Sequence, residues 1–193
     1  MTTKNDNKKR CPWVPMSDPL YVAYHDHEWG VPVYDDRTIF EFLLLESAQA
    51  GLSWRTVLHK RENYRKAFAG FDPKKISTFT KRDVSRLMND AGIIRNRLKI
   101  EAAINNARVF LDIQKEFGTF AHYVWQFVGG KPLVHKLKMA TDYQEDIPEA
   151  VELSKDLKKR GCKFLGPKIV YAYMQATGMV NDHVVGCFRY REV

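Results

Sequence analysis

Four side chains that could bind a metal ion stand near the two ends of this 193-residue chain. His183 and Cys187 are four residues apart near the C-terminus, and Cys11 precedes His25 near the N-terminus. A spacing of four places two side chains on one face of a helix, although Gly186 makes a turn an equal alternative. Two thiolates and two imidazoles are a ligand set of closed, structural zinc sites. Buried cysteines and histidines are also common in ordinary cores, so spacing alone leaves both interpretations open.

A second candidate is a carboxylate within an apolar run. Glu46 follows "IFEFLLL", and the nearby aromatic residues include Tyr21, Tyr24, Trp29 and Trp54. A carboxylate in apolar surroundings is costly unless it is paired or used. Among aromatic faces it could bind a flat, cationic heterocycle through stacking, cation–π contact and a hydrogen bond. The alternative, which the residues alone favour, is a Glu46 that points to solvent from a helix whose aromatic neighbours fill the core.

The third candidate is the stretch "RLMNDAGIIRNRLKI" at 86–100. It predicts a helix, a tight turn at Gly92 and a second helix, with Arg95, Arg97 and Lys99 beyond the turn. Such a hairpin can present backbone amides and a helix N-terminus to a phosphate, although most short helix–turn–helix pairs are only connections.

Helices must position these groups, because caps and breakers divide the chain at helical lengths. The expected helices cover about 37–50, 54–69, a segment from Pro73, 81–90, 95–116, a segment from Thr119 to Gly129, 149–160 and 168–177. No strand with alternating polarity is evident, and 129–147 has the weakest pattern, which is typical of a surface connection. The predicted fold class is all-α.

Composition and charge narrow the range of partners. The chain is 45% hydrophobic and carries a formal charge of +8, which suits a globular protein with a polyanionic partner such as nucleic acid. A solvated basic surface would give the same charge. No apolar run is long enough to span a membrane, "MTTKNDNKKR" lacks the features of a signal peptide, and three cysteines suggest no disulfide framework. We expect a cytoplasmic monomer.

Five blocks of the sequence resemble the DNA-3-methyladenine glycosylase I family: "DPLYVAYHDHEWGVP", "LESAQAGLSWRTVLHKRENYRKAF", "DAGIIRNRLKI", "LKKRGCKFLGP" and "NDHVVGC". The resemblance implies a helix-hairpin-helix DNA glycosylase fold, with one domain over 11–190, undivided or in two lobes, after a disordered basic tail over 1–10. It also implies hydrolysis of the N-glycosidic bond of 3-methyladenine in alkylated double-stranded DNA, which releases the free base and leaves an abasic site.

The resemblance further implies roles for single residues. Glu46 matches the acidic residue that hydrogen-bonds the base, and we take it as catalytic. Leu52 matches the residue that contacts the gap left by the lesion. The matching ligands of a structural zinc ion, which would join the two ends of the chain, are Cys11, His25, His183 and Cys187. The matching substrate-binding positions are Tyr24, Trp54, Tyr21, Trp29 and Trp13. The matching DNA-binding hairpin positions are Gly92, Ile94, Arg95 and Arg97.

Two departures from the wider superfamily bear on mechanism. Its hairpins usually read Gly-hydrophobic-Gly, whereas this one reads Gly92-Ile93-Ile94, and its usual catalytic Asp is absent. An Asp that activates water is therefore not expected. Methylation at N3 makes adenine cationic and hence a good leaving group, so the enzyme would flip the nucleotide, exclude water and stabilise an oxocarbenium-like sugar.

Two other activities fit the same residues. A zinc-stapled DNA-binding module would bind DNA in a salt-sensitive way and release no base. A bifunctional glycosylase would cut the strand through a lysine Schiff base. No lysine occurs in the stretches 11–34 and 46–54, which favours a monofunctional enzyme without strand cleavage.

Overall fold

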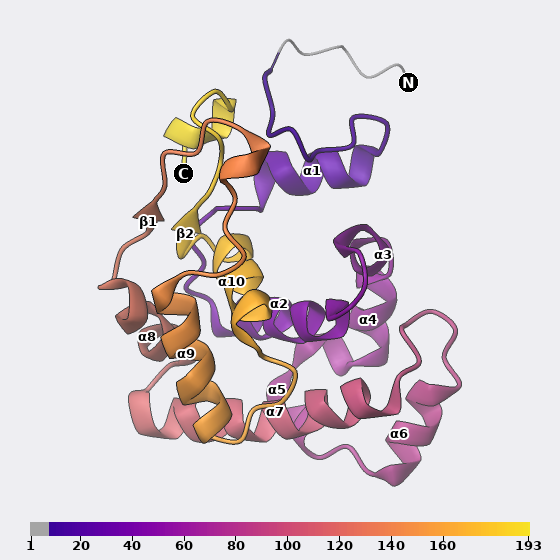
Figure 1. Ribbon diagram of the computed structural model, residues 1–193. Coiled ribbons are helices and arrows are strands. Elements are labelled where there is room, and N and C mark those ends of the chain that lie inside the picture. The colour runs from indigo at the N-terminus through magenta and orange to yellow at the C-terminus, as the bar shows by residue number, and fades with distance from the viewer. Residues whose placement is uncertain (1–7) are drawn as a thin grey trace.

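The computed structural model describes residues 8–193, so residues 1–7 of the predicted tail lie outside the described part. Between residues 8 and 193 the fold is mostly helical, as predicted (Figure 1). The α-helices are α1 (Pro19–His27), α2 (Asp36–Gln49), α3 (Trp54–Leu58), α4 (Arg61–Ala67), α5 (Pro73–Ser77), α6 (Lys81–Met88), α7 (Arg97–Phe117), α8 (Phe120–Trp125), α9 (Pro148–Lys159) and α10 (Pro167–Ala176). The strands are β1 (Leu133–Val134) and β2 (Val180–Asn181).

Side-chain caps explain where several helices begin. Ser53 and Asn96 accept hydrogen bonds from backbone N–H groups in the first turns of α3 and α7. Thr80 and Asp83 form a capping box at the start of α6. These side chains satisfy N–H groups that a helix itself cannot pair, so local sequence sets the helix starts.

The single helix predicted over 54–69 is wrong, because the chain turns at His59 and Lys60 between α3 and α4. His59 Nε2 lies 2.7 Å from Asp18 Oδ2 at the start of α1, and Lys60 Nζ donates to the Ala91 carbonyl at 3.1 Å. The turn therefore joins α3 to α1 and α4 to the segment that precedes α7.

Two short strands, which were not identified from the sequence, accompany the helices. β1 pairs with β2 in parallel, with Leu133 opposite Val180 and Val134 opposite Asn181. The segment 129–147 is correspondingly not a simple surface connection, since Leu137 is 7% exposed and Ile147 3%. Each β-strand has only two residues, too few for an alternating pattern to appear in the sequence.

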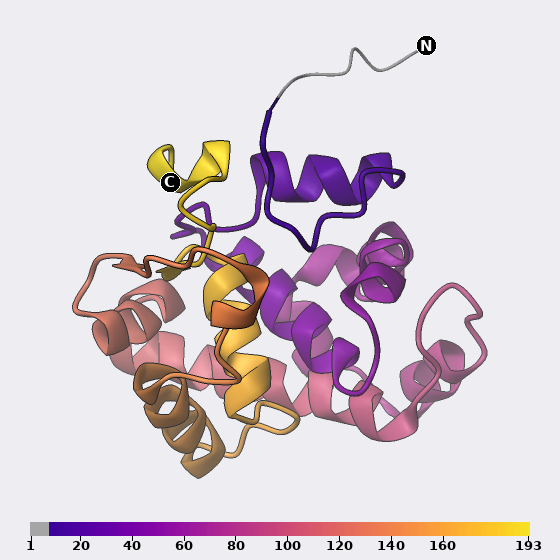
Figure 2. The same cartoon turned by 45° about the horizontal axis from the view of Figure 1, so that its top comes forward.

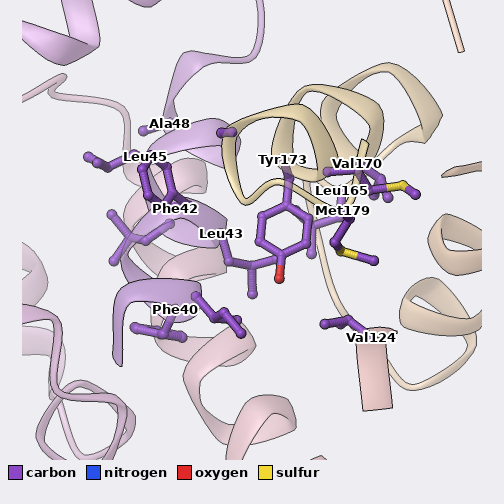
Figure 3. Packing of buried hydrophobic residues seen from close by; sticks show 14 of the residues in the cluster. Phe40, Phe42, Leu43, Leu45, Ala48, Val124, Leu165, Val170, Tyr173 and Met179 are labelled. Carbon is purple, nitrogen blue, oxygen red and sulfur yellow. The ribbon is translucent and has the colours of Figure 1, made fainter. Parts of the chain in front are cut away.

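Helix α2 runs through the centre of the protein. It is buried on nearly all sides and packs against α3, α7, α8 and α10. Figure 3 shows Leu43 of α2 beside Tyr173 of α10. A helix that is apolar all round belongs in a core, and each large side chain fully buried there contributes about 1.5–3 kcal/mol. The same burial carries Glu46, in the last turns of α2, into the interior.

The first and last described segments lie side by side, above the helical body in Figures 1 and 2. Phe188 N donates to the Lys9 carbonyl at 2.9 Å, and Arg10 forms an ion pair with Asp26 of α1. Residues 8–10 thus contact the folded domain. In the described range, no helix combines the length and apolarity needed to cross a membrane.

Candidate base pocket and metal-binding cluster

A pocket of about 220 Å³ opens between α1, α2, α3 and α10. It brings together Glu46 and all five aromatic residues predicted to bind the base. The lining residues are Trp13, Tyr21, Tyr24, Trp29, Glu46, Gln49, Trp54, Tyr143, Ala172 and Gln175. Aromatic walls with a few polar groups are typical of sites for small, flat ligands.

Glu46 is the acidic residue of this pocket. Its side chain is 3% exposed and makes no hydrogen bond to another residue between 8 and 193. Burial raises the pKa of the carboxyl to about 8. An ionised carboxylate without a partner is unfavourable at such a site, so a cationic or hydrogen-bonding ligand would supply the missing partner. The alternative in which Glu46 points to solvent is wrong.

Aromatic rings surround the carboxyl. The centroids of Tyr24 and Trp54 are 5.3 Å apart at 44°, and those of Trp13 and Trp29 are 4.7 Å apart at 75°. Burial, followed by the charge of Glu46, raises the pKa of Tyr24 well above its ordinary value, so its phenol remains a neutral donor. Trp54 Nε1 is buried without an acceptor in the described range, which leaves a second polar group of the pocket unpaired.

Gln49, Tyr143, Ala172 and Gln175 line the pocket but were missed in the sequence. Tyr143 comes from the segment 129–147, and its hydroxyl accepts a hydrogen bond from Trp13 Nε1 at 3.0 Å. It is the only Phe, Tyr or Trp in that segment, which was the available signal. Gln175 is on α10 and carried no signal, because its contact with the pocket depends on tertiary packing.

The four predicted metal ligands form one buried cluster. Cys11, His25, His183 and Cys187 offer one ligand atom each, and these atoms all lie within 4.8 Å of one another. Cys187 Sγ is 3.5 Å from His25 Nε2 and 3.5 Å from His183 Nδ1. Cys187 follows a turn rather than a helix, the alternative that Gly186 left open. The cluster could hold a metal ion.

The second nitrogen of each histidine is already paired. His25 Nδ1 lies 2.8 Å from Asp26 Oδ1, and that carboxylate is held by Arg10. His183 Nε2 lies 3.1 Å from the carbonyl oxygen of Trp29. Such outer contacts fix the rings of metal-binding histidines, so His25 Nε2 and His183 Nδ1 are oriented toward the two thiols. The donor set and its support fit a tetrahedral zinc ion.

A basic edge adjoins the pocket where α2 ends and α7 begins. Lys99 Nζ of α7 donates to the carbonyls of Ala48 and Ala50 at 2.8 and 2.6 Å, and Leu52 is 40% exposed at the tip of the loop that follows. This contact joins the loop between α2 and α3, called here the pocket loop, to the hairpin formed by α6, the turn at Gly92 and α7.

Two of the amides in the hairpin are used within the protein. Gly92 N donates to Asp90 Oδ1 and Ile94 N to the Tyr64 hydroxyl. The first-turn N–H groups of α7, at Arg97 and Leu98, have no acceptor within their own helix by position. The amides that can face a phosphate are therefore those at the helix start rather than those at Gly92 and Ile94.

Comparison with known proteins identifies the family. A family model described as methyladenine glycosylase matches residues 13–190. The chain belongs to the methyladenine glycosylase family. It is 52% identical to DNA-3-methyladenine glycosylase 1 of Escherichia coli (strain K12) over 182 residues, which is 94% of this chain and 97% of that protein.

Solved structures agree with the family assignment. A crystal structure of a 3-methyladenine DNA glycosylase I matches with a TM-score of 0.91 and 51% identity over 93% of this chain and 98% of that one. The 3-methyladenine DNA glycosylase I of Staphylococcus aureus matches with a TM-score of 0.87 and 43% identity over 89% and 91%. In this methyladenine glycosylase chain, the predicted site residues form three groups: the pocket, the Cys/His cluster and the hairpin.

Proposed function

We propose that this protein hydrolyses the N-glycosidic bond of 3-methyladenine in alkylated DNA and so begins base-excision repair. The observation that carries the proposal is Glu46, a buried carboxyl without a protein partner in an aromatic pocket. A base methylated at N3 is flat and cationic, and it brings both the faces that aromatic rings bind and the charge that a carboxylate binds. Relatives of this chain bear the name of this activity.

The chemistry follows from the charge of the substrate. The base departs as a neutral molecule, so no residue needs to protonate it. Trp54 and Tyr24 hold the flipped base, and a cation over such a ring contributes about 0.5–2 kcal/mol. Glu46 is nearer to its ionised form when the cation enters, because an opposite charge lowers the pKa that burial raised. The bound base and the aromatic walls exclude bulk water while charge moves from the base to the sugar, and one water molecule then adds to C1′ and releases a proton.

Cys11, His25, His183 and Cys187 would hold a structural zinc ion, which supplies cross-linking of the two chain ends and no step of the reaction. Their other contacts lie among protein groups, so the cluster has no open side toward the base. Leu52 would fill the gap left by the flipped nucleotide. Arg95, Arg97 and the first turn of α7 would hold the DNA backbone.

The first experiment is chromatography of the bases released from methylated duplex DNA, with wild type beside Glu46→Gln. Wild type is expected to release 3-methyladenine. The variant should lose about 10- to 100-fold in kcat/KM, since a hydrogen bond to a charged group contributes about 1.5–3 kcal/mol. Wild-type protein that binds DNA without releasing any base would instead be a DNA-binding module.

The enzyme is expected to leave the DNA strand intact. No residue that lines the pocket is a lysine, and Lys99 is bound to the carbonyls of Ala48 and Ala50. A Schiff base needs an amine at C1′ of the sugar. Borohydride should therefore trap no covalent protein–DNA complex, and a trapped complex would identify a bifunctional enzyme.

A further inference from the structure

Gln175 lies in the last turn of α10 and lines the pocket together with Glu46 and Trp13. Its backbone carbonyl accepts a hydrogen bond from Gly30 N at 3.0 Å, which ties α10 to the loop that carries Trp29. The position of the residue in the pocket wall is therefore fixed from two elements.

The side-chain amide of Gln175 is also oriented. Its Nε2 donates to Asp182 Oδ2 at 2.6 Å, and the Tyr171 hydroxyl donates to the same oxygen. Asp182 is fully buried, and its other oxygen lies 2.6 Å from His135 Nδ1. A carboxylate accepts hydrogen bonds and does not donate them, so it selects the NH₂ end of the amide. Gln175 Oε1 has no donor among residues 8–193, and it is the end of the amide that remains for a ligand.

We propose that Gln175 determines which methylated purine the pocket accepts, by presenting Oε1 as a fixed hydrogen-bond acceptor, and that Asp182 is its positioning residue. This inference rests on the proposed glycosylase function. At the same ring position adenine carries an amino group and guanine a carbonyl oxygen. An amino group would donate to Oε1, whereas a carbonyl oxygen would leave two acceptors facing each other in a closed site. The pocket thus selects 3-methyladenine over 3-methylguanine.

Glu46 differs from Gln175, because its carboxyl can gain or lose a proton. Its pKa is about 8 in the free pocket, and an entering cation lowers it, so the hydrogen-bonding character of Glu46 changes with its protonation. The amide of Gln175 cannot adapt in this way while Asp182 holds its nitrogen.

The test is a competition on one duplex DNA that carries both 3-methyladenine and 3-methylguanine. The ratio of the two bases released reports the ratio of their kcat/KM values and does not depend on the active fraction of a preparation. Gln175→Met keeps the length of the side chain and removes both the NH₂ group and the oxygen of the amide. We expect the preference for 3-methyladenine to fall about tenfold or more. Gln126→Met, the same change at an exposed site, should keep the wild-type ratio.

Variants of Asp182 test the positioning role. Asp182→Asn retains an oxygen that can face Gln175 and Tyr171, so it should keep most of the preference. Asp182→Ala frees the amide to rotate and should lower the preference toward that of Gln175→Met. Because His183 is adjacent, the metal content of each variant is measured alongside.

The outcomes separate the two proposals. Wild type that releases neither base would refute the proposed function. Wild type that releases 3-methyladenine together with an unchanged ratio in Gln175→Met would refute the role of Gln175 only. Should Gln175→Met release neither base, binding of free 3-methyladenine and 3-methylguanine, followed by tryptophan fluorescence, replaces the competition. If Gln175→Met binds the two free bases with the same preference as wild type, that result would also refute the role of Gln175.

Discussion

Glu46, the proposed base-binding residue, is expected to destabilise the fold. Burial raises its pKa from 4.5 to about 8. Below pH 4.5 the carboxyl is neutral in folded and unfolded chains alike, and its contribution to stability is fully present. Between pH 4.5 and 8 only the unfolded chain ionises, so stability falls as pH rises. At 1.36 kcal/mol per pH unit the loss approaches about 4–5 kcal/mol.

The prediction is that Glu46→Gln gains stability over wild type as pH rises, although it loses activity. Urea unfolding of both proteins at pH 4, 6 and 9 measures the difference in unfolding free energy. It should be smallest at pH 4 and largest at pH 9. An equal difference at all three values would mean that the carboxyl is already ionised in the free protein, with a partner that stabilises it.

At the same scale, the sequence revealed some pocket residues and concealed others. Glu46 was a candidate because an acidic residue within an apolar run is conspicuous, but the pocket roles of Glu46 and Trp54 came from the resemblance to a known family. Tyr143 and Gln175 were missed, because they reach the pocket from segments more than 90 residues away from Glu46 in the sequence, and the one available signal was that Tyr143 is the only Phe, Tyr or Trp of 129–147. No local pattern encodes such a contact.

At the scale of elements, Lys99 is the link between the hairpin helix and the pocket loop. Its ammonium group donates to two carbonyls at the C-terminus of α2, where the helix dipole favours a positive charge. Lys99→Met keeps the alkyl chain and removes these bonds. The unfolding free energy should fall by about 1.5–3 kcal/mol, and affinity for methylated DNA should fall as the loop around Leu52 loosens.

Salt dependence distinguishes this role from a phosphate contact. If Lys99 holds the loop, the slope of log affinity against log salt stays at the wild-type value, whereas a lost phosphate contact lowers it by about 0.9. Lys115→Met, an exposed lysine on the same helix, is the matched control and should leave stability nearly unchanged. If the slope in Lys99→Met falls by about 0.9, Lys99 contacts a phosphate, and the assigned role is wrong.

Helix boundaries were predictable where a cap or a breaker set them. Thr80 with Asp83 begins α6, and Gly118, with a φ of 84°, ends α7. The break between α3 and α4 was not predictable, because neither His59 nor Lys60 is a helix-breaking residue. Their side chains instead contact Asp18 at the start of α1 and the Ala91 carbonyl beside the hairpin. Tertiary contacts override local propensity there.

At the scale of the molecule, the Cys/His cluster joins the two ends of the chain and forms the back of the pocket wall. Trp13 packs on His25 with centroids 5.2 Å apart, and Trp29 on His183 at 4.6 Å. The residue types and spacings predicted two pairs of ligands, one near each end of the chain. That the two pairs meet depends on the tertiary fold. The fluorescence of Trp13 and Trp29 should therefore depend on whether the cluster holds a metal ion.

Metal analysis of purified protein is expected to give about one zinc per chain, lost in Cys187→Ala. At a free zinc concentration 1,000 times the dissociation constant, binding adds about 4 kcal/mol, so chelation should lower Tm by about 8–16 °C. It should also shift the tryptophan emission, because Trp13 and Trp29 contact the ligand rings. Cys162→Ala removes a buried cysteine outside the cluster and should retain the metal. A Cys187→Ala protein with full zinc content would refute the ligand assignment, and an unchanged melting temperature after chelation would refute the stabilising role.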